Sequence, residues 1–341
     1  MKRLSFYALL ILIGACGKTD DPPVEKAPDF EGYTLVWSDE FNDDAINANN
    51  WVHELGDGTA YGLPPGWGNN ELQLYTDAAE NASIEKDANN VSALVIAATE
   101  DGPGNYRSAK LTKQGLQHFR YGKIDARIKL PTAQGMWPAF WMLGENRTEV
   151  DWPGCGEVDI VELVGSAPNR IQSNVHYTNG DKEYSNDEGS PVILDETLDQ
   201  NYHNFTIDWT PTEITFSLDG AVYKTTAIAD DMKEFQRSFY LILNVAVGGD
   251  WPGPPDASTT FPQKMYVDYV RYYSKDGFTA PDPPVLDIDE ETVGVLRPQS
   301  LAQHAFNSTL GQFPDMEIMV FGAGGEPFIS STDVVVEGDS A

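Results

Sequence analysis

Residues 152–162 of the chain read WPGCGEVDIVE, a stretch in which three carboxylates stand among strand-forming residues. Side chains alternate between the two faces of a regular strand, so Glu157 and Asp159 share a face. Glu162, five residues after Glu157, would point to the opposite face. One β-bulge between Asp159 and Glu162 adds a residue to the strand and turns Glu162 back. The sequence therefore predicts a bulged strand with three acids on one surface.

Such crowding of carboxylates suggests a catalytic site. Like charges a few Å apart raise one another's pKa and resist full ionisation. A retaining glycosidase needs one ionised carboxylate as nucleophile and one protonated carboxyl as general acid, about 5–5.5 Å apart. The alternative is a solvent-facing strand of an acidic protein. Against it, Val158, Ile160 and Val161 make a credible strand, and the aromatic-rich segments on both sides offer surfaces for sugar rings.

Six further segments accompany this stretch in a fixed order, and together they span about residues 30–275. They read WSDEF (37–41), GNNEL (68–72), YGKIDAR (121–127), GMWPAFWML (135–143), LNVAVGG (243–249) and VDYVR (267–271). In this order they resemble the laminarinase-like β-1,3-glucanases of glycoside hydrolase family 16. The resemblance implies an all-β jelly-roll sandwich of the concanavalin A-like type, with a glycan cleft on its concave face. It also implies Glu157 as nucleophile, Glu162 as general acid/base and Asp159 as their assistant.

The N-terminus predicts export. Residues 1–15 begin with a charged segment and continue with a short apolar run, as a secretory signal peptide does. Residues 13–16, IGAC, look like a bacterial lipobox, which would make Cys16 the lipidated first residue of the mature protein. The alternative is an ordinary signal peptide followed by an incidental cysteine. We expect an exported bacterial lipoprotein at the outer membrane or cell surface, attached to the membrane only through its lipid.

The remaining chain reads as one large β domain with a tether and a tail. We assign residues 16–29 to a flexible tether, 30–275 to the catalytic domain and 276–285 to a proline-containing linker. Residues 286–341 form an acidic tail or a small module of unknown role. Alternating apolar residues predict strands at 91–99, 121–130, 140–143, 157–164, 171–177, 204–209, 213–218, 222–226, 239–247 and 265–273. Asp219-Gly220 predicts a hairpin turn, 229–235 a short helix, and the Gly- and Pro-rich 58–68 a loop over the cleft.

Composition excludes several classes of function. The formal net charge is −31, which argues against nucleic acid as a partner, because phosphate binding needs a basic face. If Cys16 carries lipid, Cys155 has no disulfide partner, and we interpret it as a small buried hydrophobic residue rather than a catalytic thiol. The five histidines and two cysteines do not have zinc-site spacing. We expect a monomer whose chemistry needs no cofactor.

Aromatic residues are candidate platforms for sugar rings, because sugars present apolar ring faces edged with hydroxyls. The candidates are Trp137, Trp141, Trp152 and Trp251. Trp137 and Trp141 are an even number of residues apart and so face the same side of a strand. In the family both positions line the cleft. Each tryptophan could instead belong to the core.

Four polar residues match substrate-contacting positions of the family. Asn69 and Glu71 correspond to residues that contact the sugar beside the cleaved bond, with a polar turn as the alternative. His176 corresponds to a histidine near the catalytic acids, although a core role is common for such a residue. Lys110 stands where many relatives have arginine, and lysine has no planar fork, so a bidentate contact to substrate would be lost.

The family also often binds a structural calcium ion on the convex side. Asp268 matches the aspartate that holds it, Glu40 is a second candidate, and Ser92 stands where relatives commonly use a glycine carbonyl. Calcium prefers six to eight oxygen ligands. The alternative is that Asp268 only ends a strand.

The leading hypothesis is an endo-acting hydrolase that cleaves laminarin-type β-1,3-glucan with retention of configuration. A second candidate keeps the enzyme but changes the substrate to mixed-linkage β-glucan or a marine galactan. A third is a glucan-binding protein, whose relatives typically lack one or both glutamates. The acidity of the chain and the pairing of residues 137–141 with 152–155 favour a neutral β-glucan as partner.

Overall fold

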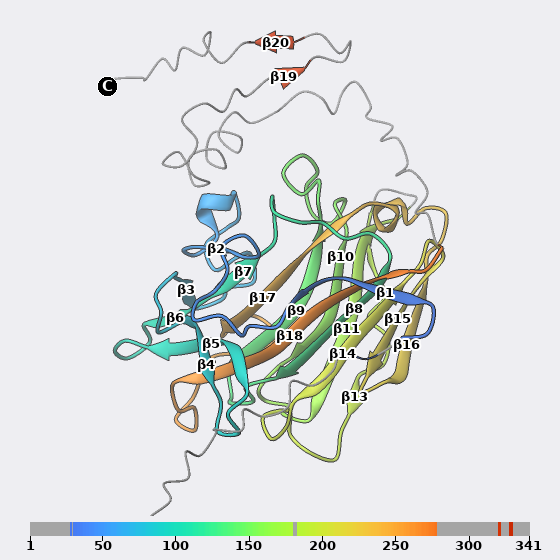
Figure 1. The fold of residues 1–341 in the computed structure, drawn as a ribbon. Helices are drawn as coiled ribbons and strands as arrows, with labels where there is room; N and C mark the ends of the chain where they lie inside the picture. The colour runs from blue at the N-terminus through green and yellow to red at the C-terminus, as the bar shows by residue number, and fades with distance from the viewer. Residues whose placement is uncertain (1–27, 29, 180–182, 278–319, 322–326, 330–341) are drawn as a thin grey trace, which may run out of the picture. The chain divides into compact units, whose positions relative to one another are not determined.

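The computed structural model describes residues 28, 30–179 and 183–277, together with the backbone of β19 (Val320–Phe321) and β20 (Pro327–Ile329) (Figure 1). The predicted signal peptide with Cys16, most of the tether and most of the tail lie outside the described residues. The chain divides into two compact units, residues 1–284 and 285–341. In the second unit β19 pairs antiparallel with β20.

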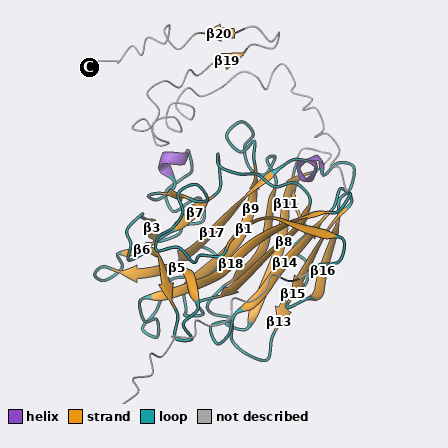
Figure 2. Cartoon of the chain, in the orientation of Figure 1, coloured by secondary structure: helices purple, strands orange, loops and turns teal. Residues whose placement is uncertain are grey.

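The first unit is a sandwich of two large sheets, and strands account for nearly all of its regular structure (Figure 2). In the described part of the chain, the first sheet contains ten strands, of which eight form its main path and two pair with strands of that path. Its main path is, in order, β16 (Ala221–Ala227), β15 (Glu213–Leu218), β14 (His203–Trp209), β8 (Gly122–Lys129), β18 (Gln263–Lys275), β5 (Ser92–Glu100), β6 (Tyr106–Ser108) and β3 (Gln73–Tyr75), and the two added strands are β1 (Tyr33–Asp39) and β4 (Ala82–Lys86).

The second sheet contains eight strands of the described chain and carries the acidic motif near its middle. The order is β12 (Tyr184–Asn186), β11 (Arg170–Thr178), β10 (Glu157–Leu163), β9 (Met136–Gly144), β17 (Phe239–Val247), β7 (Lys110–Thr112) and β2 (Val52–Glu54), with β13 (Val192–Ile193) beside β11. The predicted all-β jelly-roll sandwich is confirmed.

Alternation along each strand separates the core from the site. On β9, Phe140 and Met142 are fully buried in the core, whereas Trp137 and Trp141 lie on the other face, half-buried. The core between the sheets is completed by apolar residues such as Ile128 of β8. The second face of the eight-stranded sheet is thus left for polar and aromatic side chains.

All ten predicted strands are present, with bounds that differ by a few residues. The strands that sequence missed are mostly three residues long or less, such as β7 and β13, too short for a period to show. The predicted helix at 229–235 is wrong: only Lys233–Gln236 forms a 3₁₀ helix, because a single turn cannot offset the cost of starting an α-helix. A second 3₁₀ turn, Thr59–Tyr61, lies inside the predicted loop 58–68.

The predicted hairpin turn joins β15 to β16. Asp219 has φ 49° and Gly220 has φ 80°, the two positive values that a type I′ turn requires. Within the described residues, none of the helical segments has the length and apolar character needed to cross a membrane.

Candidate active site

The three acids of the opening motif lie on β10, and the predicted bulge is present. Glu157 pairs with His176 of β11 and Asp159 with Asn174, after which the register shifts so that Glu162 pairs with Gln172. The register with β9 shifts in the same place. The bulge returns Glu162 to the face of the other two acids, while Val158, Ile160 and Val161 enter the core.

Gly156, the residue directly before β10, has a backbone conformation and a close packing that only glycine can adopt. Gly156 has φ 81°, and a Cβ there would lie 2.7 Å from the Phe239 ring and 2.8 Å from the Cβ of Glu234. The neighbouring Cys155 is fully buried against Tyr240 and Ile242. Burial raises the pKa of its thiol to about 12, so Cys155 acts as the small buried residue that was predicted.

Each glutamate is held by an indole. The Nε1–H of Trp152 donates to Glu157 Oε2 at 3.1 Å, and the Nε1–H of Trp137 donates to Glu162 Oε1 at 2.9 Å. His176 contacts both Glu157 and Asp159: its Nε2 lies 3.6 Å from Glu157 Oε1 and 3.1 Å from Asp159 Oδ2. Each glutamate is thus oriented by a different tryptophan.

Burial raises the pKa of all three carboxyls. The pKa of Glu157 rises well above its usual range, first through burial and then through the charge of Asp159, whereas His176 acts to lower it. Burial raises the pKa of Asp159 to about 7, and burial together with Asp159 raises that of Glu162 to about 8. The cluster therefore retains protons at neutral pH, which supplies the protonated carboxyl that a general acid requires.

A buried lysine offsets part of this negative charge. Lys224 lies on β16, in the opposite sheet, and donates through Nζ to the carbonyl of Ser173 at 3.0 Å. Its charge lowers the pKa of Asp159, and its own pKa falls to about 8 because it is buried. Lys224, a residue of the other sheet, thus offsets part of the negative charge of the acids.

Aromatic rings flank the acids on both sides. Trp251 lies edge-on to Trp137, with ring centroids 5.5 Å apart. On the other side Trp152 packs against Tyr184, at 5.3 Å, and against His176, at 5.8 Å. Trp152 and Trp251 remain 44% and 42% exposed, so their rings are available to a ligand.

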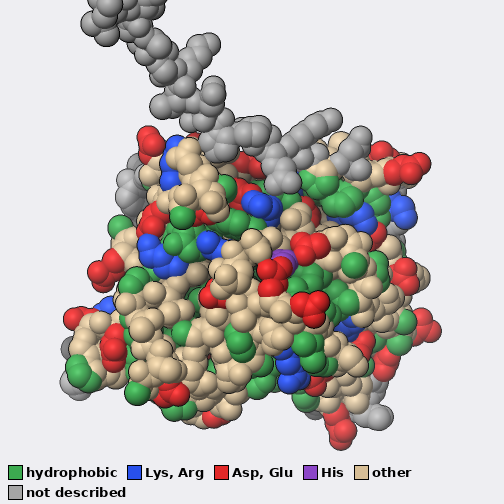
Figure 3. Space-filling view, turned by 90° about the horizontal axis from the view of Figure 1, so that it is seen from below, with side chains coloured by type: hydrophobic (Ala, Val, Ile, Leu, Met, Phe, Trp, Pro, Cys, Tyr) green, Lys and Arg blue, Asp and Glu red, His purple; other side chains and the backbone are tan. Residues whose placement is uncertain are grey.

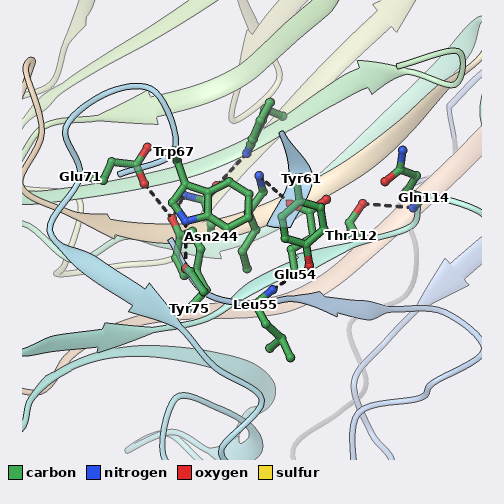
Figure 4. A network of polar contacts seen from close by, with 12 residues as sticks. Glu54, Leu55, Tyr61, Trp67, Glu71, Tyr75, Thr112, Gln114 and Asn244 are labelled. Atoms are coloured by element: carbon green, nitrogen blue, oxygen red, sulfur yellow. Dashed lines mark hydrogen bonds and ion pairs between the residues drawn. The ribbon is translucent and has the colours of Figure 1, made fainter. Parts of the chain in front are cut away.

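A polar network joins Glu71, Tyr75 and Asn244 (Figure 4). The Nε1–H of Trp141 donates to Asn244 Oδ1 at 2.7 Å, and Asn244 Nδ2 donates to the Tyr75 hydroxyl at 3.0 Å. That hydroxyl lies 3.5 Å from Glu71 Oε2, which also accepts from Gln73 at 2.7 Å.

The other carboxyl oxygen of Glu71 accepts from the amide of Asn69 at 3.1 Å. Burial raises the pKa of Glu71, while the donors Asn69 and Gln73 act to lower it. The side chains of Asn69, Glu71 and Trp141 therefore belong to one connected region of the site.

Charge on the surface is mostly negative. On the face in Figure 3, a histidine lies among acidic side chains near the centre, and further acidic side chains surround the rim. The net charge of −31 has the same sign. Such a surface suits an uncharged ligand better than a polyanion.

The model of the glycosyl hydrolases family 16 matches residues 70–271, more than half of the chain. The chain belongs to glycosyl hydrolase family 16. A β-glucanase of Rhodothermus marinus is 34% identical over 288 residues, which cover 80% of this chain and 95% of that relative. The catalytic domain of an endo-1,3-β-glucanase (laminarinase) from Thermotoga petrophila RKU-1 is 42% identical, with a TM-score of 0.63, over 71% of this chain and 98% of that domain.

A third relative of this family 16 member is much longer. The alpha subunit of clotting factor G from Tachypleus tridentatus is 34% identical over 255 residues, which cover 73% of this chain and 35% of that subunit. The chain thus spans about a third of that relative. The family and the acids together make the protein a glycoside hydrolase.

Lys110 lies beside the Trp141 ring of this family 16 hydrolase, largely shielded from solvent. It is only 7% exposed, and its ammonium forms a 2.7 Å ion pair with Glu54. The same ammonium lies 4.2 Å from the centroid of Trp67 and 5.0 Å from that of Trp141. The ammonium of Lys110 is thus held between Glu54 and the two aromatic rings, where it contacts the Trp141 platform.

The two predicted calcium ligands are engaged by arginines. Asp268 Oδ2 accepts from Arg127 at 2.6 Å, and Arg271 donates to both carboxyl oxygens of Glu40, at 2.9 and 2.7 Å. Each of the two carboxylates is thus paired with a guanidinium in this structure. Calcium at Asp268 remains a prediction from the family resemblance.

Among the described residues, one group of acids and histidine could chelate an ion, with ligand atoms within 4.8 Å of one another: Glu157, Asp159 and His176. These are residues of the acid cluster itself. The hydrolytic chemistry of the family needs no cofactor.

Several residues of the site were missed by sequence reasoning. Gln73 and Tyr75 follow Glu71 at a period of two, and Asn244 is a polar residue inside the apolar run 239–247, so both signals were visible. Tyr184 and Lys224 gave no signal, because their contacts with the site depend on distant strands.

Proposed function

We propose that this family 16 hydrolase cleaves β-1,3-linked glucan at internal bonds with retention of configuration. The observation that carries the proposal is the bulged strand β10, which presents Glu157, Asp159 and Glu162 on one face between aromatic platforms. The names of similar proteins, a β-glucanase and an endo-1,3-β-glucanase (laminarinase), support the substrate class.

The reaction proceeds in two displacements. In the first, ionised Glu157 attacks the anomeric carbon, the glycosidic bond breaks, and protonated Glu162 gives its proton to the departing oxygen. In the second, Glu162 takes a proton from water, and the resulting oxygen nucleophile releases the sugar from Glu157 with the same anomeric configuration as the substrate. The raised pKa of Glu162, about 8, keeps the proton available for the first step.

Neighbouring groups keep the glutamates in these roles. Two neighbours oppose the burial that raises the pKa of Glu157: the indole of Trp152 donates to its carboxylate, and His176, 3.6 Å away, acts to lower its pKa. Asp159 lies between the glutamates in sequence and shares His176 with Glu157.

The arrangement of platforms fits a neutral chain of sugars. Trp137, Trp141 and Trp251 offer ring faces, and Asn69 and Glu71 offer amide and carboxyl groups for hydroxyls. Because all of these residues come from one chain, we propose that the enzyme acts as a monomer. Incubation with laminarin, lichenan, agarose and carrageenan should give short β-1,3 oligosaccharides from laminarin first. Faster cleavage of agarose would refute the substrate assignment.

The roles of the two glutamates can be separated with an activated aryl β-glucoside. Both Glu157→Gln and Glu162→Gln should abolish most turnover of laminarin. The aryl leaving group needs little protonation, so Glu162→Gln should still form the glycosyl-enzyme and release aryl alcohol in a burst, whereas Glu157→Gln should not. Equal loss of the burst in both variants would contradict the assignment.

We further propose that Cys16 is acylated and anchors the enzyme at the outer membrane or cell surface, with residues 16–29 as tether. Support comes from the lipobox-like residues 13–16 alone. The wild type should partition with membranes, and Cys16→Ser should be released from them. Soluble wild-type protein without lipid at residue 16 would remove the proposal.

A further inference from the structure

The bulge of β10 locally interrupts the regular ladder between β10 and β11. Between the pairs Asp159–Asn174 and Glu162–Gln172, two residues of β10 lie opposite one residue of β11, Ser173. Within the bulge, the Ser173 hydroxyl donates a hydrogen bond to the backbone carbonyl of Ile160 at 2.7 Å. Ser173 is 2% exposed, so water is not an alternative donor for a group at this depth.

A tyrosine of the opposite sheet completes the arrangement. The Tyr223 hydroxyl lies 2.5 Å from Ser173 Oγ and 3.5 Å from Ile160 O. The two hydroxyls therefore supply two protons, one for the Ser173–Tyr223 contact and one for Ile160 O. Lys224 donates to the carbonyl of the same serine at 3.0 Å, so both the side chain and the backbone of Ser173 are bound by β16.

Consecutive residues of a strand normally face opposite sides, yet Tyr223 and Lys224 both reach inward. A register shift on β16 explains this: Phe216 pairs with Lys224 and Ser217 with Val222, which leaves Tyr223 as the extra residue. Val222 is accordingly 62% exposed, whereas Lys224 is 8% exposed. Two bulges, one in each sheet, therefore meet at Ser173.

We propose that Ser173 and Tyr223 are positioning residues that hold the bulge of β10 and thereby keep Glu162 on the same face as Glu157. Strand parity gives the reason. A strand without the bulge would direct Glu162 away from the acids and away from the indole of Trp137 that binds it. The hydroxyl pair supplies the hydrogen bonding that the bulge removes from the ladder, and so favours the bulged form.

The inference rests on the proposed retaining mechanism, in which Glu162 is the general acid. General acid–base catalysis contributes about 10²–10⁴-fold, and a displaced Glu162 loses part of this. In Ser173→Ala and Tyr223→Phe we expect kcat/KM on laminarin to fall about tenfold or more. The rate of the dinitrophenol burst from 2,4-dinitrophenyl β-laminaribioside should fall by less than about threefold, because this leaving group departs without protonation by a general acid.

Matched controls separate this effect from a general loss of structure. In Ser92→Ala the lost hydroxyl also donates to a backbone carbonyl at 2.7 Å, that of Phe41, in the ten-stranded sheet. In Tyr272→Phe the lost hydroxyl donates to the carbonyl of Arg120 at 3.4 Å. Both controls should keep the wild-type ratio of kcat/KM on laminarin to the rate of the dinitrophenol burst. Ser173→Thr, which retains a hydroxyl, should recover most of that ratio.

Several outcomes would overturn the inference. One is an unchanged ratio in Ser173→Ala and Tyr223→Phe, with both activities falling in proportion or neither falling. Another is the same change of ratio in the controls. If Ser173→Ala fails to fold, Tyr223→Phe decides, because it keeps the ring and removes only the hydroxyl. A wild-type enzyme that cuts no β-glucan would instead contradict the proposed function.

Discussion

Replacement of Glu162 by glutamine should stabilise the folded protein, and the gain should increase with pH. Burial raises the pKa of Glu162 from its usual 4.5 to about 8. The folded state therefore binds this proton more tightly than the unfolded chain does. The contribution of Glu162 to stability is fully present below pH 4.5 and is lost as pH rises through about 8. Glutamine has nearly the same shape and never ionises, so the variant escapes that loss.

The two pKa values set the size of the effect. They differ by about 3.5, which at about 1.36 kcal/mol for each pKa unit corresponds to about 4.8 kcal/mol. This is an upper limit, because Asp159 titrates in the same range and shares the repulsion. We expect about 2–3 kcal/mol at pH 9. For a domain of this size about 1 kcal/mol moves the melting temperature by about 2–4 °C, so Glu162→Gln should melt about 4–12 °C above wild type.

Thermal melts followed by circular dichroism from pH 4 to pH 9 measure this difference. Near pH 4 the two proteins should melt within about 1 °C of each other, because both carry an uncharged side chain at residue 162. Glu85→Gln is a control of opposite sign. A hydrogen bond from Lys264 lowers the pKa of Glu85, so this carboxylate stabilises the fold above its unfolded pKa, and that contribution disappears as pH falls.

Two results would refute the reasoning. A melting difference between Glu162→Gln and wild type that does not change with pH would show that burial does not perturb the titration of Glu162. A variant that melts below wild type at pH 9 would show that the ionised glutamate stabilises the fold.

Further predictions concern rate, binding and metal. For wild type, kcat/KM on laminarin should fall as pH rises through about 8, because Glu162 loses the proton it donates, and a flat alkaline limb would contradict this. Asn244→Leu removes the acceptor of the Trp141 indole, so KM should rise about fivefold, as expected for about 1 kcal/mol, with kcat within about twofold; unchanged KM would exclude the supporting role. The calcium prediction requires that a chelator lower the melting temperature with little change of rate, and unaltered melting would remove Asp268 as a ligand.

Much of the acid motif was predictable from sequence, because its geometry is local. Strand parity alone required a bulge between Asp159 and Glu162 if the acids were to share a face, and the register shift occurs there. The same period placed Trp137 and Trp141 together on the face opposite to the core. The turn at Asp219-Gly220 is equally local, since its residues tolerate the positive φ that the hairpin demands.

The surroundings of the motif were decided only by tertiary structure. Lys110 forms an ion pair with Glu54 on the neighbouring strand β2, and no local pattern connects these two residues. Tyr223 and Lys224 lie about fifty residues from Ser173 and reach it only because a bulge in one sheet faces a bulge in the other. Periodicity determines which face of its strand a side chain occupies, whereas the partner it meets there depends on how the two sheets pack across the core.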